Sequence, residues 1–206
     1  PTGAVFAFAR FLLSLDQAYP SPYGAVVFDL GKPVQRLAVL PEYKAQRPPM
    51  PEELRAQTPV IREWLVAAGW PIVEQEGCEA DDLLAGLAAN FADFPVWIVS
   101  GDKDLCQLVD DRVQMLITGK HGALTVRGSA EVEEKFGVAP AQMADYLALL
   151  GDVSDNIPGV DGVGPKTAAD LIKRFGSLSG MMSRLHEIGN ENLRHRLQAA
   201  ASQLEI

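Results

Sequence analysis

Residues 151–172 read "GDVSDNIPGVDGVGPKTAADLI", and this stretch places Asp152 and Asp155 directly ahead of a glycine-rich turn and a helix. Carboxylates of this kind hold divalent cations, whereas a glycine turn that opens a helix is suited to holding phosphate. The two halves fit together if a phosphate backbone is bound beside a metal. The alternative is that both carboxylates only cap the turn after a helix.

The glycine turn is the most specific signal in the sequence. Pro165 falls in the first turn of the expected helix, which tolerates a missing N–H, and Gly176 falls where that helix should end. The free N–H groups at the helix start favour a phosphate, beside the side chains of Lys166 and Thr167. Three glycines let the preceding turn bring its backbone close to a ligand: Gly159, Gly162 and Gly164. Such binding would be independent of base sequence and sensitive to salt. The alternative is that this segment is a plain helical hairpin without a binding role.

Two short apolar runs predict buried strands, one at 23–30 ("YGAVVFDL") and one at 95–99 ("PVWIV"). Helical spacing occurs between them, at 51–69 and 79–92. Strands that alternate with helices predict an α/β fold with a mostly parallel central sheet flanked by helices.

Other segments complete the expected organisation. Residues 113–128 predict a hairpin that turns at "GKHG", and helices are expected at 130–137 and 140–152. The apolar opening, 1–15, is interrupted by Arg10 and predicts an amphipathic core helix rather than a signal peptide.

Acidic residues gather at the ends of these elements, which is where open α/β sheets place their sites. Asp29 lies at the end of the first strand, and Asp102 and Asp104 follow the second. Other acids open the helix at 79–92, where they would also favour the helix dipole and cap free N–H groups. A two-metal site needs carboxylates from several elements, and this pattern supplies them. The candidate metal ligands are Asp29, Glu79, Asp81, Asp82, Asp102, Asp104, Asp152 and Asp155.

Composition describes a globular chain of 206 residues with 48% hydrophobic content and a formal net charge of −9. That net charge alone argues against a nucleic-acid partner, although bound cations would offset the acidic clusters. Basic residues gather in the stretch from Lys32 to Arg55. No apolar run is long enough to cross a bilayer. Cys78 and Cys106 fit no disulfide framework or zinc spacing, so a cytoplasmic protein is expected.

Five segments together resemble, in family order, the 5′-nuclease domain of bacterial DNA polymerase I and its flap-endonuclease relatives. They are "VVFD", "YKAQRPPMP", "EGCEADDLLAGLA", "SGDKDLCQLV" and "GDVSDNIPGVDGVGPKTA". The resemblance implies a PIN-like 5′-nuclease fold, with a nuclease core at 1–150, an arch at about 30–52 and a helix–three-turn–helix subdomain at 151–206. It also implies hydrolysis of DNA at a 5′ flap, or at a 5′ end beside a duplex, with two divalent cations, Mg²⁺ or Mn²⁺. The eight carboxylates match the metal ligands of the family.

The resemblance assigns further residues to the handling of DNA. Lys44 and Arg36 match catalytic basic residues of the arch, although the usual "TFR" of the family reads "VQR" here. The DNA contacts it implies are Tyr43, Lys44, Arg47, Gly159, Gly162, Val163, Gly164, Lys166 and Thr167. It also implies a potassium ion at the helix–three-turn–helix and an associated DNA polymerase.

The sequence departs from the family pattern at its start. Family members carry a strand with "DG" and a metal-binding aspartate before the segment matched by "PTGA" at 1–4. The alternative prediction is therefore a non-catalytic or weakly active module that binds branched DNA.

Overall fold

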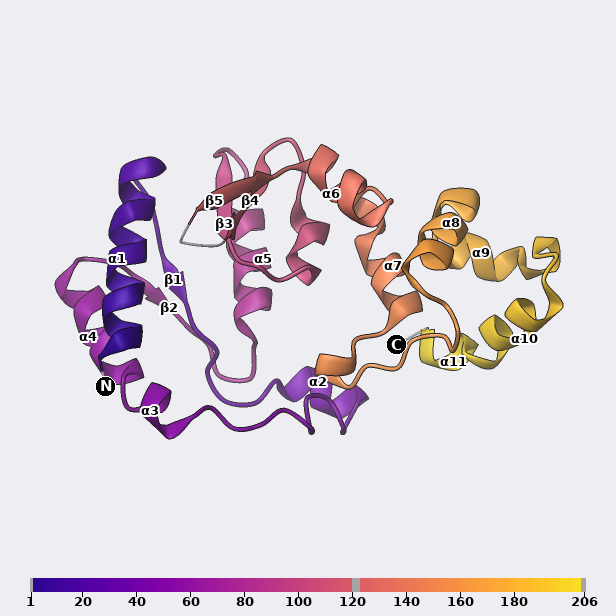
Figure 1. Cartoon of the computed structure of the whole chain (residues 1–206), viewed down its shortest axis with the longest axis horizontal. Helices are drawn as coiled ribbons and strands as arrows, with labels where there is room; N and C mark the ends of the chain where they lie inside the picture. The colour runs from indigo at the N-terminus through magenta and orange to yellow at the C-terminus, as the bar shows by residue number, and fades with distance from the viewer. Residues whose placement is uncertain (1, 120–122, 205–206) are drawn as a thin grey trace. The chain divides into compact units, whose positions relative to one another are not determined.

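The computed structural model describes residues 2–119 and 123–204, and the chain divides into two compact units. Unit 1 comprises Pro1–Leu37 and Arg47–Leu84, and unit 2 comprises Ala38–Gln46 and Ala85–Ile206. Helix α2 (Val34–Val39) and helix α5 (Ala80–Asn90), which are labelled in Figure 1, each contribute residues to both units.

Unit 1 is built on a pair of very short parallel strands, β1 (Val26–Val27) and β2 (Ile72–Val73). Helices α1 (Gly3–Ala18) and α4 (Thr58–Ala67) pack together beside them (Figure 1). Their contact forms an apolar core whose buried members are Leu12, Ile61 and Leu65. The strand expected at 23–30 is therefore present, but it is limited to Val26 and Val27, and Leu30 adds an isolated parallel bridge to Glu76.

The helical segment expected at 51–69 is interrupted. Helix α3 (Glu52–Arg55) ends before α4 begins, and Pro59 lies in the first turn of α4. Gln57 falls between the two helices and is buried; its Oε1 accepts hydrogen bonds from the backbone N–H groups of Ala4 and Val5 at 2.8 and 3.3 Å. The interruption thus places one amide side chain where it satisfies two donors at the start of α1.

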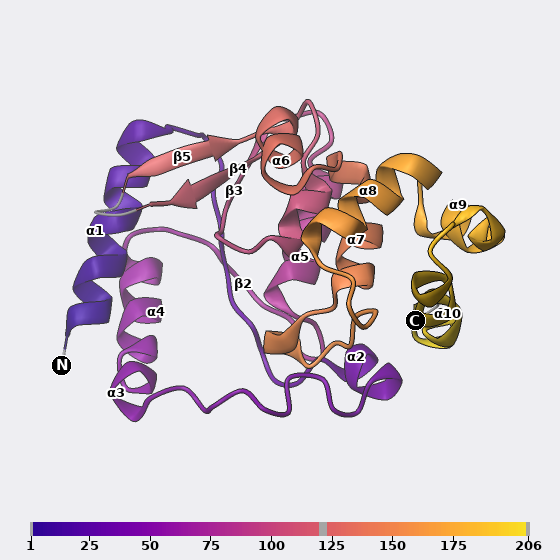
Figure 2. The ribbon, with the colours of Figure 1, turned by 45° about the vertical axis from the view of Figure 1, so that its right-hand side comes forward.

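Unit 2 contains a three-stranded sheet in the order β3 (Val96–Val99), β4 (Val113–Thr118) and β5 (Leu124–Arg127). Strand β3 pairs with β4 in parallel, whereas β4 and β5 run in opposite directions (Figure 2). The predicted hairpin is therefore confirmed, and residues 120–122 of its turn lie outside the described residues. Parallel pairs of strands flanked by helices confirm the α/β class in both units.

Helices form the rest of unit 2. The sheet leads into α6 (Ser129–Phe136) and α7 (Met143–Leu150), and α7 packs against α8 (Pro165–Phe175). Three shorter helices follow: α9 (Leu178–Ser183), α10 (Glu191–Ala199) and α11 (Ala201–Leu204). The buried apolar residues of these two helices include Met143, Tyr146, Leu149, Ala168, Leu171, Ile172 and Phe175.

Within the part of the chain that the structure describes, every helix is too short or too polar to cross a membrane.

Candidate metal and DNA-binding site

The candidate metal-binding carboxylates of unit 1 gather at the N-terminus of α5. Asp29 follows β1, and its Oδ1 accepts a hydrogen bond from the backbone N–H of Ala80 at 2.7 Å. Asp82 lies in the first turn of α5, and its Oδ2 accepts from the N–H of Glu79 at 3.1 Å. Asp81 lies in the same turn. The cap expected for these acids is thus formed, and the positive end of the helix dipole stabilises their charge.

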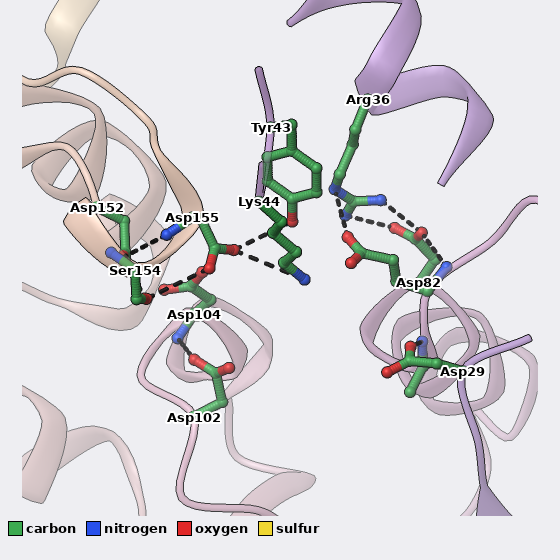
Figure 3. A network of polar contacts seen from close by, with 12 residues as sticks. Asp29, Arg36, Tyr43, Lys44, Asp82, Asp102, Asp104, Asp152, Ser154 and Asp155 are labelled. Carbon is green, nitrogen blue, oxygen red and sulfur yellow. Dashed lines mark hydrogen bonds and ion pairs between the residues drawn. The ribbon is translucent and has the colours of Figure 1, made fainter. Parts of the chain in front are cut away.

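Arg36, from α2, neutralises two of these carboxylates at once. Its Nε lies 3.0 Å from Oε2 of Glu79, which is buried. Its two terminal nitrogens contact the two carboxylate oxygens of Asp82 at 2.6 and 2.8 Å (Figure 3). This two-pronged geometry uses the planar guanidinium fully, and a lysine would not reproduce it.

The candidate metal-binding carboxylates of unit 2 lie after β3 and at a short 3₁₀ turn, Val153–Asp155, whose N-cap is Asp152. Oδ1 of Asp102 accepts from the N–H of Asp104 at 3.0 Å (Figure 3). Burial raises the pKa of Asp104, and the charges of Asp102, Asp152 and Asp155 raise it further. Negative charge is thus concentrated here, and a bound cation would be stabilised.

Asp152 and Asp155 are each held by several partners. Oδ1 of Asp152 accepts from the N–H groups of Ser154 and Asp155 at 2.7 and 3.2 Å, which is the capping role expected as the alternative. Oδ2 of Asp152 accepts a hydrogen bond from Nζ of Lys103. Burial alone would raise the pKa of Asp152, but the hydrogen bonds from Lys103 and Ser154 lower it to about 2. The carboxylate is therefore ionised throughout the physiological range.

The basic segment predicted as an arch is anchored on this 3₁₀ turn through residues 42–46. Tyr43 is buried, and its hydroxyl donates to Oδ2 of Asp155 at 3.1 Å (Figure 3). The N–H of Lys44 donates to the carbonyl of Asp155 at 2.9 Å, and Nζ of Lys44 lies 3.7 Å from Oδ2 of Asp155. The side chain of Asn156 donates to the carbonyl of Glu42 at 2.8 Å. Tyr43 therefore acts as a packing anchor, whereas Arg47 is exposed.

The donor chemistry of both acidic groups suits a hard divalent cation, because every candidate is a carboxylate oxygen. Among residues 2–119 and 123–204, however, no three His, Cys, Asp or Glu side chains already surround one point as metal ligands would. Several of the carboxylates contact basic side chains instead, among them Arg36 in unit 1 and Lys103 in unit 2.

The glycine turn and α8 form as the sequence predicts. Gly164 precedes α8, Pro165 is in its first turn, and Gly176 ends it with φ +83°. The backbone N–H groups of Lys166 and Thr167 lie at the helix start, where they have no acceptor within the helix. Lys166 is exposed and Thr167 is partly exposed, whereas the side chain of Val163 is buried.

The three glycines of the turn differ in what surrounds them. A Cβ on Gly159 would lie 2.1 Å from the carbonyl oxygen of Leu150, so packing within the chain requires that glycine. Gly162 has φ +66°, and a Cβ there would meet a guanidinium nitrogen of Arg196 at 1.9 Å. Around Gly164 a Cβ would meet nothing within 4 Å, so only this glycine has open space where a ligand would approach.

Two features of the site are not evident from the sequence alone. Lys103 is not among the metal ligands or DNA contacts predicted from the sequence, although its position between Asp102 and Asp104 indicates charge compensation. Arg196 closes the glycine turn by donating to the carbonyl of Asp161 at 2.9 Å, across 35 positions, and no local pattern indicates this contact.

Comparison with known proteins identifies the class. Residues 1–137 match the 5′-3′ exonuclease N-terminal resolvase-like domain, and residues 138–206 match the 5′-3′ exonuclease C-terminal SAM fold. These two domains in this order define a 5′-nuclease protein class. The chain belongs to the 5′-3′ exonuclease family.

Two relatives illustrate the range of that family. A protein of Aquifex aeolicus named 5′-3′ exonuclease is 42% identical over 193 residues, which cover 93% of this chain and 66% of that protein. DNA polymerase I of Pseudomonas aeruginosa is 47% identical over 178 residues, which cover 85% of this chain and 19% of the polymerase. The chain thus spans about two thirds of the first relative and about a fifth of the second.

Solved structures agree with this assignment. The D15 protein of T5, co-crystallised with metal ions, has a TM-score of 0.83 at 27% identity, covering 100% of this chain and 79% of that one. The bacteriophage T5 D15 flap endonuclease, in a pseudo-enzyme–product complex with DNA and metal ions, has a TM-score of 0.80 at 27% identity; it covers 98% of this chain and 78% of that one.

Proposed function

We propose that this chain is a structure-selective 5′-nuclease that hydrolyses DNA phosphodiesters at a 5′ flap or at a 5′ end beside a duplex. One observation carries the proposal. The chain belongs to the 5′-3′ exonuclease family, and it has both a carboxylate cluster after β3 and a glycine turn at the start of α8. The metal ions and DNA in the T5 structures support the same assignment.

The carboxylates of the two units would hold two divalent cations, Mg²⁺ or Mn²⁺. Asp29, Glu79, Asp81 and Asp82 are the donors in unit 1, and Asp102, Asp104, Asp152 and Asp155 are the donors in unit 2. Such cations lower the pKa of water and offset charge on a reacting phosphate, which removes the need for a nucleophilic side chain. Neighbouring groups of the chain orient these carboxylates, as the N–H of Ser154 does for Asp152, and the hydrogen bonds from Lys103 and Ser154 lower the pKa of Asp152 to about 2.

The glycine turn would bind the duplex. Gly164 leaves open space for a phosphate, and Lys166 adds a positive charge beside the free N–H groups of α8. The family resemblance also implies a potassium ion held by backbone carbonyl oxygens of this turn. Contacts of this kind ignore base sequence, so affinity should fall steeply with salt.

The arch segment would bind the single strand. Lys44 is placed beside Asp155 by its backbone, so its ammonium would meet a phosphate held at that carboxylate group. The exposed Arg47 would neutralise phosphates farther along the strand. Arg36 would act beside Glu79 and Asp82, where it already bridges two carboxylates.

We also propose residues 1–150 as the nuclease core, with the arch at about 30–52, and residues 151–206 as the DNA-binding subdomain. The polymerase relatives support an association with a DNA polymerase in replication and repair.

The second candidate is a module that binds branched DNA without cleaving it. The contacts of Arg36 and Lys103 with the carboxylates favour this candidate, because these side chains take up oxygens that a cation would need.

One experiment separates the two candidates. A 5′-labelled flap substrate and a plain duplex are incubated with the chain in Mg²⁺, and affinity for both is measured in EDTA. Cleavage at the flap junction that is lost in Asp102→Asn, with DNA affinity unchanged, supports the nuclease. Tight binding of the flap substrate with no cleavage in Mg²⁺ or Mn²⁺ supports the non-catalytic module.

A further inference from the structure

Lys103 occupies a central position among the carboxylates of unit 2. It follows β3 between Asp102 and Asp104, and its ammonium reaches Asp152, which is 49 positions away in the sequence. Nζ donates a hydrogen bond to Oδ2 of Asp152 and lies 4.0 Å from Oδ1 of Asp104. The side chain of Asp152 is only 16% exposed, so this ion pair is shielded from solvent on the carboxylate side.

The two oxygens of Asp152 have different partners. Oδ1 accepts from the N–H of Ser154, from its hydroxyl and from the N–H of Asp155, at 2.7, 2.5 and 3.2 Å. Those bonds form the 3₁₀ turn at Val153–Asp155, and they would be lost if Oδ1 turned away. Oδ2 is therefore the oxygen that Asp152 has to offer to a cation, and Oδ2 is the oxygen that Lys103 contacts.

We propose that Lys103 is a built-in counter-ion that competes with a divalent cation for Oδ2 of Asp152, and that it thereby sets the cation concentration at which unit 2 is loaded. This inference rests on the proposed function, because it takes Asp152 as a cation ligand. Lys103 is a positioning residue in this scheme, since it acts through Asp152 and Asp104.

Removal of Lys103 should raise the affinity for a cation, whereas removal of a lysine with a purely structural role would not. Removal of a positive charge within about 4 Å of a bound cation removes repulsion and frees Oδ2, so cation affinity should rise. Without cation, the same change leaves the carboxylates of unit 2 with less compensation, so stability should fall. Loss of a purely structural contact would lower stability and leave cation affinity unchanged or weakened.

Calorimetric titration of the whole chain with Mn²⁺, in the absence of DNA, tests the proposal. Lys103→Gln should bind Mn²⁺ on the order of tenfold more tightly than the unmodified chain. Lys103→Arg keeps the charge and should stay within about twofold of the unmodified chain. Lys135→Gln removes the same charge from an exposed position on α6, so it controls for net charge and should also stay within about twofold.

Thermal unfolding supplies a second measurement. Lys103→Gln should unfold at a lower temperature than the unmodified chain in EDTA, and the difference should shrink as Mn²⁺ is added, because the tighter binder gains more stability from the same free cation. A difference that stays constant at all Mn²⁺ concentrations would contradict the proposal.

The outcomes distinguish this inference from the function on which it rests. If the unmodified chain binds Mn²⁺ and Lys103→Gln binds it equally or more weakly, Lys103 is no competitor, although the metal site stands. If Lys103→Gln loses as much duplex affinity in EDTA as Lys166→Ala, Lys103 is a phosphate contact instead. If the unmodified chain binds no Mn²⁺, the metal chemistry of the proposed function fails, and this inference fails with it.

Discussion

Gly159→Ala should destabilise the chain severely, whereas Gly164→Ala, five positions along the same turn, should be tolerated. A Cβ on Gly159 would lie 2.1 Å from the carbonyl oxygen of Leu150 and 2.6 Å from the backbone nitrogen of Gly151. Both contacts are more than about 0.5 Å inside van der Waals distance, and neither atom belongs to a flexible side chain. The backbone would have to separate, which would also break the hydrogen bond from the N–H of Val160 to the carbonyl of Leu149 at 2.9 Å.

The magnitude follows from these two losses. Overpacking typically costs about 1–3 kcal/mol, and a lost backbone hydrogen bond adds about 1 kcal/mol, so a decrease of about 2–4 kcal/mol in the free energy of unfolding is expected. This is a large part of the stability of an ordinary domain, which is about 5–15 kcal/mol. Gly164 has an extended backbone at φ −93° and open space, so alanine there should cost no more than about 1 kcal/mol, as at other helix N-caps.

Urea denaturation followed by far-ultraviolet circular dichroism measures both changes. Equal stabilities for Gly159→Ala and the unmodified chain would refute the packing argument, and so would a loss at Gly164→Ala as large as that at Gly159→Ala. A second measurement, duplex affinity as a function of salt concentration, tests the role of Gly164 in DNA binding. Gly164→Val should weaken DNA binding and flatten its salt dependence while the fold is retained.

Three further predictions concern single charged residues. Asp104→Asn should abolish Mg²⁺-dependent flap cleavage and raise the unfolding temperature in EDTA, because burial and nearby carboxylates disfavour its charge; near-normal turnover would exclude it as a ligand. Lys44→Ala should slow flap cleavage much more than it weakens binding to plain duplex, and equal losses in the two assays would make Lys44 a general phosphate contact. Asp110→Ala should lower the free energy of unfolding by about 1 kcal/mol at pH 7, because Oδ1 of Asp110 accepts from the N–H groups of Val113 and Arg112 at 2.6 and 2.8 Å. Those hydrogen bonds lower the pKa of Asp110, so its stabilisation is complete above the ordinary carboxylate pKa of about 4 and should disappear as the pH falls below it; a difference in urea midpoints that persisted at pH 2 would contradict this.

Local patterns predicted those parts of the fold that local physics decides. The positions of Asp102 and Asp104 followed from a short apolar run that ends at Val99, because strand ends are readable from hydrophobicity. The boundaries of α8 followed from Pro165 and Gly176, whose backbone preferences are properties of single residues.

The side-chain partners could not be predicted in the same way, because they join residues far apart in the sequence. Arg36 meets Asp82 across 46 positions, and Tyr43 meets Asp155 across 112. The family motif suggested a DNA contact for Tyr43, but its burial against Asp155 depends on how the chain packs. The same limit applies to the glycines, since the sequence does not distinguish Gly159, which two backbone segments require, from Gly164, which faces open space.

The net charge of −9 is a poor guide to the partner of this chain, because several of the acidic side chains have a basic side chain beside them. The guanidinium of Arg36 contacts both Glu79 and Asp82, and the ammonium of Lys103 contacts Asp152. At close range a polyanion would therefore meet these local arrangements of charge and not the average charge of the chain, since charges separated by more than about 10 Å are screened in salt. The exposed Lys166 stands beside the N–H groups that open α8, so a cationic side chain and the positive end of the helix dipole coincide there although the chain is acidic. Association with DNA should therefore depend on the glycine turn first, and charge reversal at Lys166 should weaken it more than the same change at the exposed Lys135.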